Sequence, residues 1–160
     1  MKKIFLFIAM AASITAWAQV STVSLQASGL TCSMCSNAIN KALKKLDFVQ
    51  KVEADIKTSS FEISFKPNSI INFDMLRTSV ESAGFTVCSF VANIHFDNVR
   101  VKDNQPVLFQ GRTLRFVNTG DHIVNGVKQI KILDKGFVST KEYKMNPYLV
   151  SAPQTFHVSL

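Results

Sequence analysis

Glycine, proline and cysteine are all scarce in this chain of 160 residues, and each shortage excludes a class of protein. Six glycines and four prolines are too few for a collagen-like or low-complexity chain. Three cysteines are too few for a small domain held together by disulfides. Acidic residues number 11 against 18 lysines and arginines, so the net charge is +7. With 47% hydrophobic residues the chain can bury a core, and its length allows one ordinary domain or two small ones.

The first 18 residues have the pattern of a cleavable secretory signal peptide. Lys2 and Lys3 form a positive start, an unbroken apolar run follows over 4–12, and residues 16–18 read Ala-Trp-Ala before Gln19. The apolar run is shorter than the about 18–20 residues that a membrane-spanning helix needs. We therefore expect 1–18 to be removed and the mature chain to be periplasmic or secreted, with no stable membrane anchor.

Residues 19–92 alternate between strand and helix patterns. Apolar and polar residues alternate over 20–28, as in a half-buried strand, and apolar residues recur every three or four positions over 33–46, as in an amphipathic helix. The remaining patterns predict strands over 48–56, 60–66 and 85–92 and a helix over 73–83. The order β-α-β-β-α-β predicts an α+β fold class with a ferredoxin-like domain over 19–92.

Residues 93–160 show no helical period and carry short strand patterns separated by turn signals. The candidate strands lie over 94–101, 107–110, 113–117, 127–133 and 155–160. We expect a second, small all-β domain of unknown type, either a partly open barrel or a sheet, with the domain boundary near Ala92.

One motif indicates a chemical function. It lies between a predicted strand and a predicted helix and reads Gly29-Leu30-Thr31-Cys32-Ser33-Met34-Cys35. Two intervening residues let one loop-to-helix turn bring both sulfurs to one ion, and thiolates prefer soft ions such as Cu(I) and Zn(II). The helix N-terminus lowers the thiol pKa and makes thiolate available near neutral pH. Two ligands in a shallow loop leave an ion open to a third thiolate, which suits transfer. A disulfide between Cys32 and Cys35 is the alternative, because exported proteins meet oxidants.

The motif within this element order resembles the heavy-metal-associated domain family. That family includes copper chaperones, the metal-binding modules of copper-transporting P-type ATPases and the periplasmic mercury-binding protein. Its motif Gly-Met-Thr-Cys-x-x-Cys is matched with Leu30 in place of methionine, and the likeness extends over about 21–92. The resemblance implies that Cys32 and Cys35 are the metal ligands, that Leu30 supports the loop from the core, and that Phe85 lies in the loop facing the cysteines.

The resemblance further implies an exported metal carrier or scavenger. Its expected cargo is Cu(I), with Zn(II) or Hg(II) as other soft ions, passed by ligand exchange to a metal-transporting ATPase or another acceptor protein. Two alternatives use the same chain: a thiol-disulfide redox protein with the same cysteine pair, and a metal-sensing adaptor whose β module binds a partner. No nucleophile–base pair, phosphate loop or paired carboxylate indicates an enzyme, and no nucleic-acid partner is expected.

Other sulfur and imidazole side chains are weaker candidates for function. Cys88 is expected to be a small core side chain, with an auxiliary thiol as the alternative. Met34 is expected to be an exposed tip that contacts a partner rather than a metal ligand. His95, His122 and His157 have no ligand-like spacing, and His122, which lies in a predicted turn, is the best candidate of the three.

Overall fold

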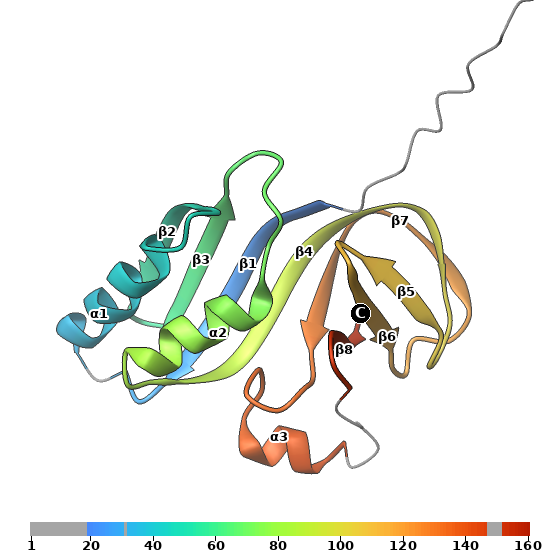
Figure 1. The fold of residues 1–160 in the computed structure, drawn as a ribbon. Helices are drawn as coiled ribbons and strands as arrows, with labels where there is room; N and C mark the ends of the chain where they lie inside the picture. Colours follow the sequence, from blue (N-terminus) through green and yellow to red (C-terminus); the bar gives the residue numbers. More distant parts are fainter. Residues whose placement is uncertain (1–18, 31, 147–151) are drawn as a thin grey trace, which may run out of the picture.

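The computed structural model describes residues 19–30, 32–146 and 152–160, so the predicted signal peptide lies outside the described residues. The described strands form one sheet in the order β2-β3-β1-β4-β7-β8-β6-β5 (Figure 1). The strands are β1 (Gln19–Ser28), β2 (Val49–Asp55), β3 (Ser60–Phe65), β4 (Thr86–Val101), β5 (Pro106–Phe109), β6 (Arg112–Phe116), β7 (His122–Ile132) and β8 (Thr155–Ser159). The helices are α1 (Ser33–Lys44), α2 (Phe73–Ser82) and α3 (Thr140–Lys144). Within the described residues, no helix has the length and apolar character needed to cross a membrane.

The part up to residue 92 has the predicted ferredoxin-like arrangement. β1 is antiparallel to β3 on one side and to β4 on the other, and β2 pairs with β3 at the edge. Helices α1 and α2 lie across one face of these strands (Figure 1). The alternating apolar residues of β1 and the apolar stripes of both helices meet in one core, because a half-buried strand and an amphipathic helix each have one face to bury. The α+β prediction for this part is confirmed.

The last predicted strand of this part does not end at Ala92. β4 continues to Val101, and its second half pairs with β7 from Val91 opposite Lys131 to Val101 opposite His122. The boundary expected near Ala92 therefore falls inside a strand. Whether residues 19–92 form a separate folding unit remains a prediction.

The strands after β4 form a curved continuation of the sheet (Figure 1). β5 and β6 are antiparallel, β6 and β8 are parallel, and β8 returns to β7 in an antiparallel pair. The C-terminal region is therefore rich in sheet, and its strands belong to the same sheet as those of the first part.

Two local features of this region differ from the expectation. The strand expected over 127–133 begins earlier, at His122, and so includes Asn125-Gly126, where Gly126 has a φ of +73° opposite an irregularity in β4. Asn-Gly suits positive φ in a bulge as well as in a turn. The short helix α3 was not predicted, because five residues are too few to show a helical period.

An aromatic cluster joins α2 and β4 to the C-terminal strands. The Phe73 ring lies against Phe90 of β4 at 5.4 Å, against Phe109 of β5 at 6.2 Å and against Phe156 of β8 at 5.6 Å between ring centroids. Phe137 packs edge-on against Phe90 at 5.2 Å and against Phe156 at 5.5 Å. All five rings are buried. The two parts of the chain therefore share one hydrophobic core.

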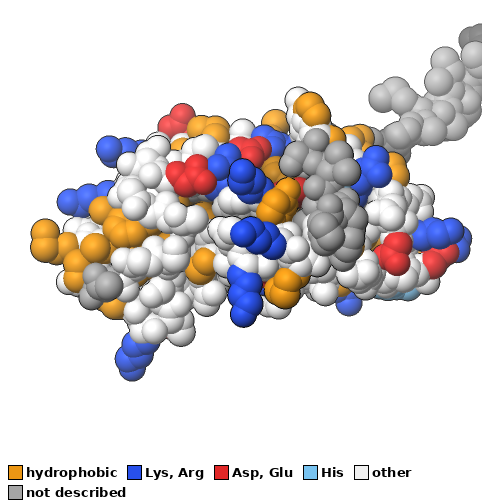
Figure 2. Space-filling model, turned by 90° about the horizontal axis from the view of Figure 1, so that it is seen from below, with side chains coloured by type: hydrophobic (Ala, Val, Ile, Leu, Met, Phe, Trp, Pro, Cys, Tyr) orange, Lys and Arg blue, Asp and Glu red, His pale blue; other side chains and the backbone are white. Residues whose placement is uncertain are grey.

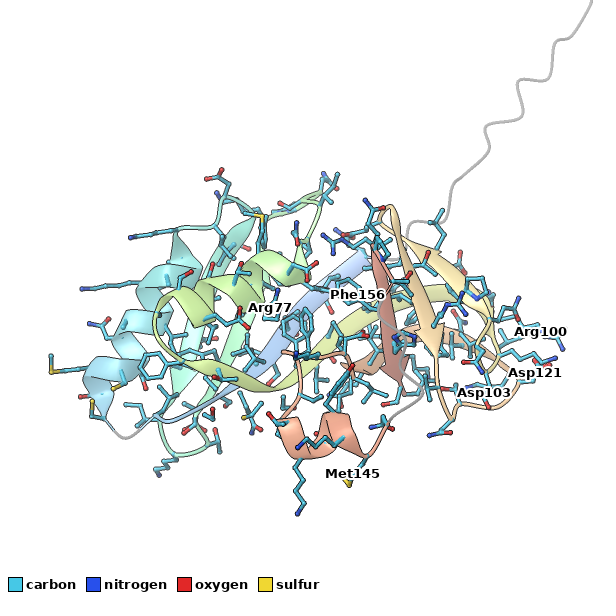
Figure 3. The ribbon with its side chains drawn as sticks, turned by 60° about the horizontal axis from the view of Figure 1, so that its bottom comes forward. Arg77, Arg100, Asp103, Asp121, Met145 and Phe156 are labelled. Atoms are coloured by element: carbon cyan, nitrogen blue, oxygen red, sulfur yellow. The ribbon has the colours of Figure 1, made fainter. Side chains whose placement is uncertain are left out.

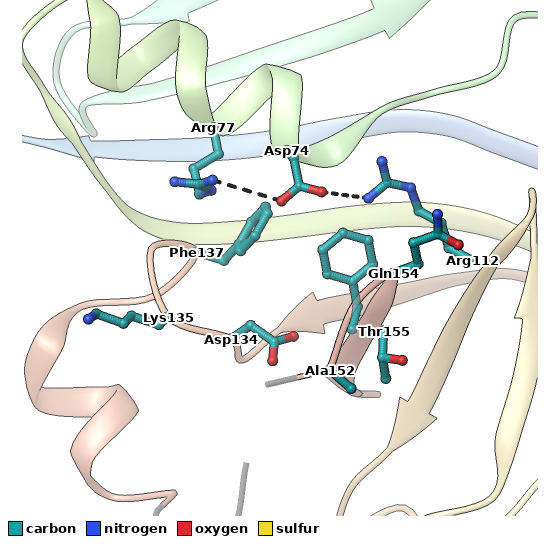
Figure 4. Close-up of a pocket in the computed structure, with 10 residues that line it drawn as sticks. Asp74, Arg77, Arg112, Asp134, Lys135, Phe137, Ala152, Gln154 and Thr155 are labelled. Carbon is teal, nitrogen blue, oxygen red and sulfur yellow. Dashed lines mark hydrogen bonds and ion pairs between the residues drawn. The ribbon is translucent and has the colours of Figure 1, made fainter. Parts of the chain in front are cut away.

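Two arginines cover this cluster at its surface. Arg112 Nη1 lies 2.5 Å from Asp74 Oδ2, and Arg77 Nη2 lies 3.9 Å from the other oxygen of the same carboxylate (Figure 4). The Arg77 guanidinium lies over Phe137 and that of Arg112 over Phe156, at 5.6 and 5.3 Å from the ring centroids. Figure 3 shows Arg77 and Phe156 together in the middle of the molecule. The start of α2 is thus held to β6 and β8 by charge as well as by packing.

The loops at the other end of the C-terminal region are fixed by two carboxylates (Figure 3). Asp103 Oδ1 accepts hydrogen bonds from the backbone N–H groups of Thr119 and Gly120 at 2.7 and 3.3 Å. The Arg100 guanidinium donates to both oxygens of Asp121 at 2.8 and 3.0 Å. Asp103 therefore joins two loops, and Asp121 ties the loop before β7 to the end of β4.

Candidate metal centre

The cysteine motif lies at the end of the sheet where β1 passes into α1. Gly29 has a φ of +82°, a left-handed conformation that glycine adopts without steric cost, and it ends β1. Cys32 is the N-cap of α1, with extended backbone angles of −152° and 162°. Cys35 follows in the first turn of the helix. The local sequence therefore places both cysteines at a helix N-terminus, where backbone N–H groups lack partners within the helix.

The two cysteine sulfurs converge. Cys32 Sγ and Cys35 Sγ are 3.1 Å apart, well beyond the about 2.05 Å of a disulfide, so the structure shows the dithiol form. Cys32 is exposed and Cys35 is half-buried. The predicted pair is thus together in space and open to solvent on the Cys32 side. Figure 2 shows hydrophobic side chains gathered at this end of the molecule, around the start of α1.

The surroundings of Cys32 favour its thiolate. The pKa of Cys32 is lowered, first by the thiol of Cys35 and then by the backbone N–H groups of Cys35 and Met34. The first turn of α1 contains no acidic residue. Partial positive charge at a helix N-terminus stabilises an anion there. A thiolate is both the nucleophile and the metal-binding form of cysteine, so this position suits binding a cation of high sulfur affinity.

Leu30 and Phe85 support the motif from the core side. Both side chains are partly buried and pack against the main hydrophobic core. Ser28 at the end of β1 is opposite Thr86 at the start of β4, so Phe85 lies at the same end of the sheet as the cysteine loop. These placements agree with the positions that the family resemblance implied for both residues.

The other candidate residues are not brought to the cysteine pair. The described residues contain no cluster of three or more His, Cys, Asp or Glu side chains suited to hold a metal ion. Cys88 lies in β4, half-buried, where its thiol donates to the Gln26 carbonyl at 3.5 Å and burial raises its pKa. His95 lies in β4 and His122 starts β7, and both are exposed.

Sequence reasoning missed the environment of His157. This histidine is buried in β8, with Nδ1 2.8 Å from Asp134 Oδ1, and its backbone N–H donates to Asp134 Oδ2 at 2.7 Å. The pair satisfies two polar groups that would otherwise be costly to bury. Nothing in the local pattern signals it, because the two residues are 23 positions apart.

Known proteins resemble the part of the chain that carries the cysteines. Residues 24–86 match the heavy-metal-associated domain. The mercuric transport protein periplasmic component of Alcaligenes sp is 34% identical over 82 residues, which cover 51% of this chain and 81% of that protein. The copper-exporting P-type ATPase of Staphylococcus aureus strain Newman is 33% identical over 66 residues, which cover 41% of this chain and 8% of the ATPase.

Among solved structures, that of oxidised MerP from Ralstonia metallidurans CH34 is similar to part of this chain. It is 28% identical in sequence, covers 43% of this chain and 94% of its own, and aligns with a TM-score of 0.39. The sequence match to the Alcaligenes protein spans most of that relative. The residues that match the family, 24–86, include the cysteine motif. The chain therefore belongs to the heavy-metal-associated domain family.

Proposed function

We propose that this protein is an exported carrier, which binds one soft metal ion between Cys32 and Cys35 and passes it to an acceptor protein by ligand exchange. The observation that supports this most strongly is the convergence of two sulfurs, 3.1 Å apart, at an exposed helix N-terminus. There the Cys35 thiol, and then the backbone N–H groups of the first turn, lower the pKa of Cys32. Thiolates select soft ions. Only modest separation of the two sulfurs is needed to admit an ion between them.

The unequal burial of the two cysteines suits transfer. Cys32 is exposed and Cys35 is half-buried. A thiolate of the acceptor approaches the ion from the exposed side, forms one metal–sulfur bond, and replaces the bond to Cys32. A second acceptor thiolate then replaces Cys35. The oxidation state of the metal does not change, and each bond that breaks is matched by one that forms.

Cu(I) and Hg(II) are the cargoes that this pair fits best. Both are soft ions that two thiolates can hold. Zn(II) fits less well, because protein sites almost always give it four ligands and the described residues offer no cluster of three or more His, Cys, Asp or Glu side chains. The names of the similar proteins support both cargoes, since they include mercuric transport and copper-exporting proteins.

The proposed acceptor is a metal-transporting ATPase or another protein with an exposed thiolate pair. The likeness to part of a copper-exporting ATPase supports this choice. Export is supported by the signal-peptide pattern and by relatives named as periplasmic components. N-terminal sequencing of the exported protein tests whether the signal peptide is removed. We expect Gln19 as the first residue, and recovery of residues 1–18 would contradict this cleavage.

A thiol-disulfide redox protein is the second candidate, because two sulfurs at 3.1 Å and a thiol of lowered pKa also favour disulfide formation. Titration with Cu(I) under reducing, anaerobic conditions separates the two functions. A carrier binds one equivalent per chain and yields it to an added dithiol acceptor. A reduced protein that takes up no stoichiometric Cu(I) or Hg(II), but exchanges disulfides with a thiol substrate, would favour the redox function.

A further inference from the structure

Met34 is a large apolar side chain that the fold does not use. Its side chain is 81% exposed, more than any other large hydrophobic residue in the described part of the chain. Met75 and Met145, by comparison, are 44% and 64% exposed. Since Met34 contributes nothing to the core, its thioether is available for contact outside the helix.

Met34 lies between the two candidate ligands in the chain, so its side chain extends from backbone that is close to both. Met34 is the second residue of α1, two positions after Cys32 and one position before Cys35. Helical side chains tilt toward the helix N-terminus, which here is the end that carries the sulfurs. Methionine is unbranched and has three rotatable side-chain bonds, so its sulfur can move to the ion while the helix stays in place.

The chemistry of a thioether distinguishes between the candidate metals. Thioether sulfur is soft and suits Cu(I), whereas protein Zn(II) sites use cysteine, histidine and carboxylate ligands. A thioether carries no charge and no acidic proton. Its addition to a Cu(I) ion held by two thiolates therefore leaves the charge of the complex unchanged and releases no proton.

We propose that Met34 is a third, weaker ligand to Cu(I) held by Cys32 and Cys35, and that it biases the site toward Cu(I) over Zn(II). This inference rests on the proposed carrier function and names Cu(I) as its cargo. The thioether occupies the exposed side of the ion until an acceptor thiolate displaces it. Because the bond to a neutral thioether is the weakest of the three, it is the first to break.

Methyl NMR tests the proposed bond directly. The full chain is labelled with ¹³C at the methionine methyl groups and titrated, reduced and without oxygen, with Cu(I) or with Zn(II). We expect the Met34 methyl signal to shift with one equivalent of Cu(I) and to stay in place with Zn(II). Met75 in α2 and Met145 at the end of α3, which lies away from α1, serve as internal controls that do not shift (Figure 3).

Matched variants measure what the bond contributes to affinity. Met34→Leu keeps an apolar side chain of similar size and removes the sulfur, and Met75→Leu makes the same change on α2. We expect Met34→Leu to weaken Cu(I) binding about tenfold, with unchanged Zn(II) binding, and Met75→Leu to change neither. If Cu(I) binds with a stoichiometry of one and the Met34 methyl does not shift, the inference is wrong and the carrier function stands. If the reduced chain binds no Cu(I), the proposal of copper transport fails with it.

Discussion

Phe73 at the start of α2 stacks on Phe109 of β5, with ring centroids 6.2 Å apart and ring planes 16° from parallel. This contact joins the heavy-metal-associated part of the chain to the strands that follow it. The other end of α2 leads through Gly84 to Phe85, at the end of the sheet that carries the cysteine loop. The C-terminal strands therefore pack against the start of a helix whose other end lies at the end of the sheet that carries the cysteine loop.

Phe137 should be among the most important residues for stability in the C-terminal part. Its ring is wedged between Phe90 and Phe156, and it is 2% exposed. We expect Phe137→Ala to lower the free energy of unfolding by about 3–5 kcal/mol, as for other buried phenylalanines. Leu108→Ala, at a position 78% exposed, should change it by no more than about 0.5 kcal/mol. Urea unfolding of both variants measures this, and equal small losses would show that the aromatic cluster contributes little.

Gly136 allows Arg77 to lie close to the turn before Phe137. A Cβ at Gly136 would lie 3.0 Å from Arg77 Cδ, whereas a Cβ at Gly126 would meet nothing within 4 Å. Both residues have positive φ, +86° and +73°, so alanine at either position costs about 1–2 kcal/mol in backbone strain. We expect Gly136→Ala to lower the free energy of unfolding by about 0.5–1 kcal/mol more than Gly126→Ala does, because the Arg77 contact with Phe137 is disturbed. Thermal unfolding of both variants measures this difference. An equal loss of stability in the two variants would contradict the predicted role of the contact between Arg77 and Phe137.

A fragment of residues 19–92 should fold without the rest of the chain. It contains the four strands and two helices of the ferredoxin-like pattern, with β4 shortened, and domains of about 55–65 residues do fold alone. Its stability should be lower than that of the full chain, because Phe73 and Phe90 lose the rings that cover them. Calorimetry should show a cooperative transition, and the fragment should still bind metal. A fragment that is molten or aggregated would show that the chain is one extended domain.

Cys32 and Cys88 should differ in reactivity as the pH changes. The pKa of Cys32 is lowered by Cys35 and the helix N–H groups, so its thiolate persists below the pH at which an ordinary cysteine becomes protonated. Burial raises the pKa of Cys88, so this residue stays a thiol to higher pH. We expect iodoacetamide to modify Cys32 well before Cys88 at pH 7, and the rate at Cys32 to fall only as the pH drops through its lowered pKa. Peptide mass spectrometry gives both rates, and faster modification of Cys88 would contradict this.

The sequence was informative where a feature depends on local periodicity. The alternation in β1 and the helical spacing of α1 predicted the ferredoxin-like order, and two cysteines in a loop-to-helix turn were expected to converge. Features that depend on distant residues were not predictable in this way. Asp74 and Arg112 are 38 positions apart and meet only because the C-terminal strands bring the start of β6 to the start of α2. The continuation of β4 past Ala92 likewise depends on pairing with β7.

The central claim is that Cys32 and Cys35 together hold one soft metal ion. Native mass spectrometry of the reduced protein, with Cu(I), Hg(II) and Zn(II) offered in competition, tests it most directly. We predict one Cu(I) or Hg(II) ion per chain, little Zn(II), and loss of this ion in both Cys32→Ser and Cys35→Ser. Cys88→Ser, the matched control on β4, should change the affinity by less than about tenfold, or about 1.4 kcal/mol. Retention of a stoichiometric soft ion by the Cys32→Ser and Cys35→Ser variants, or its loss in Cys88→Ser alone, would contradict the account.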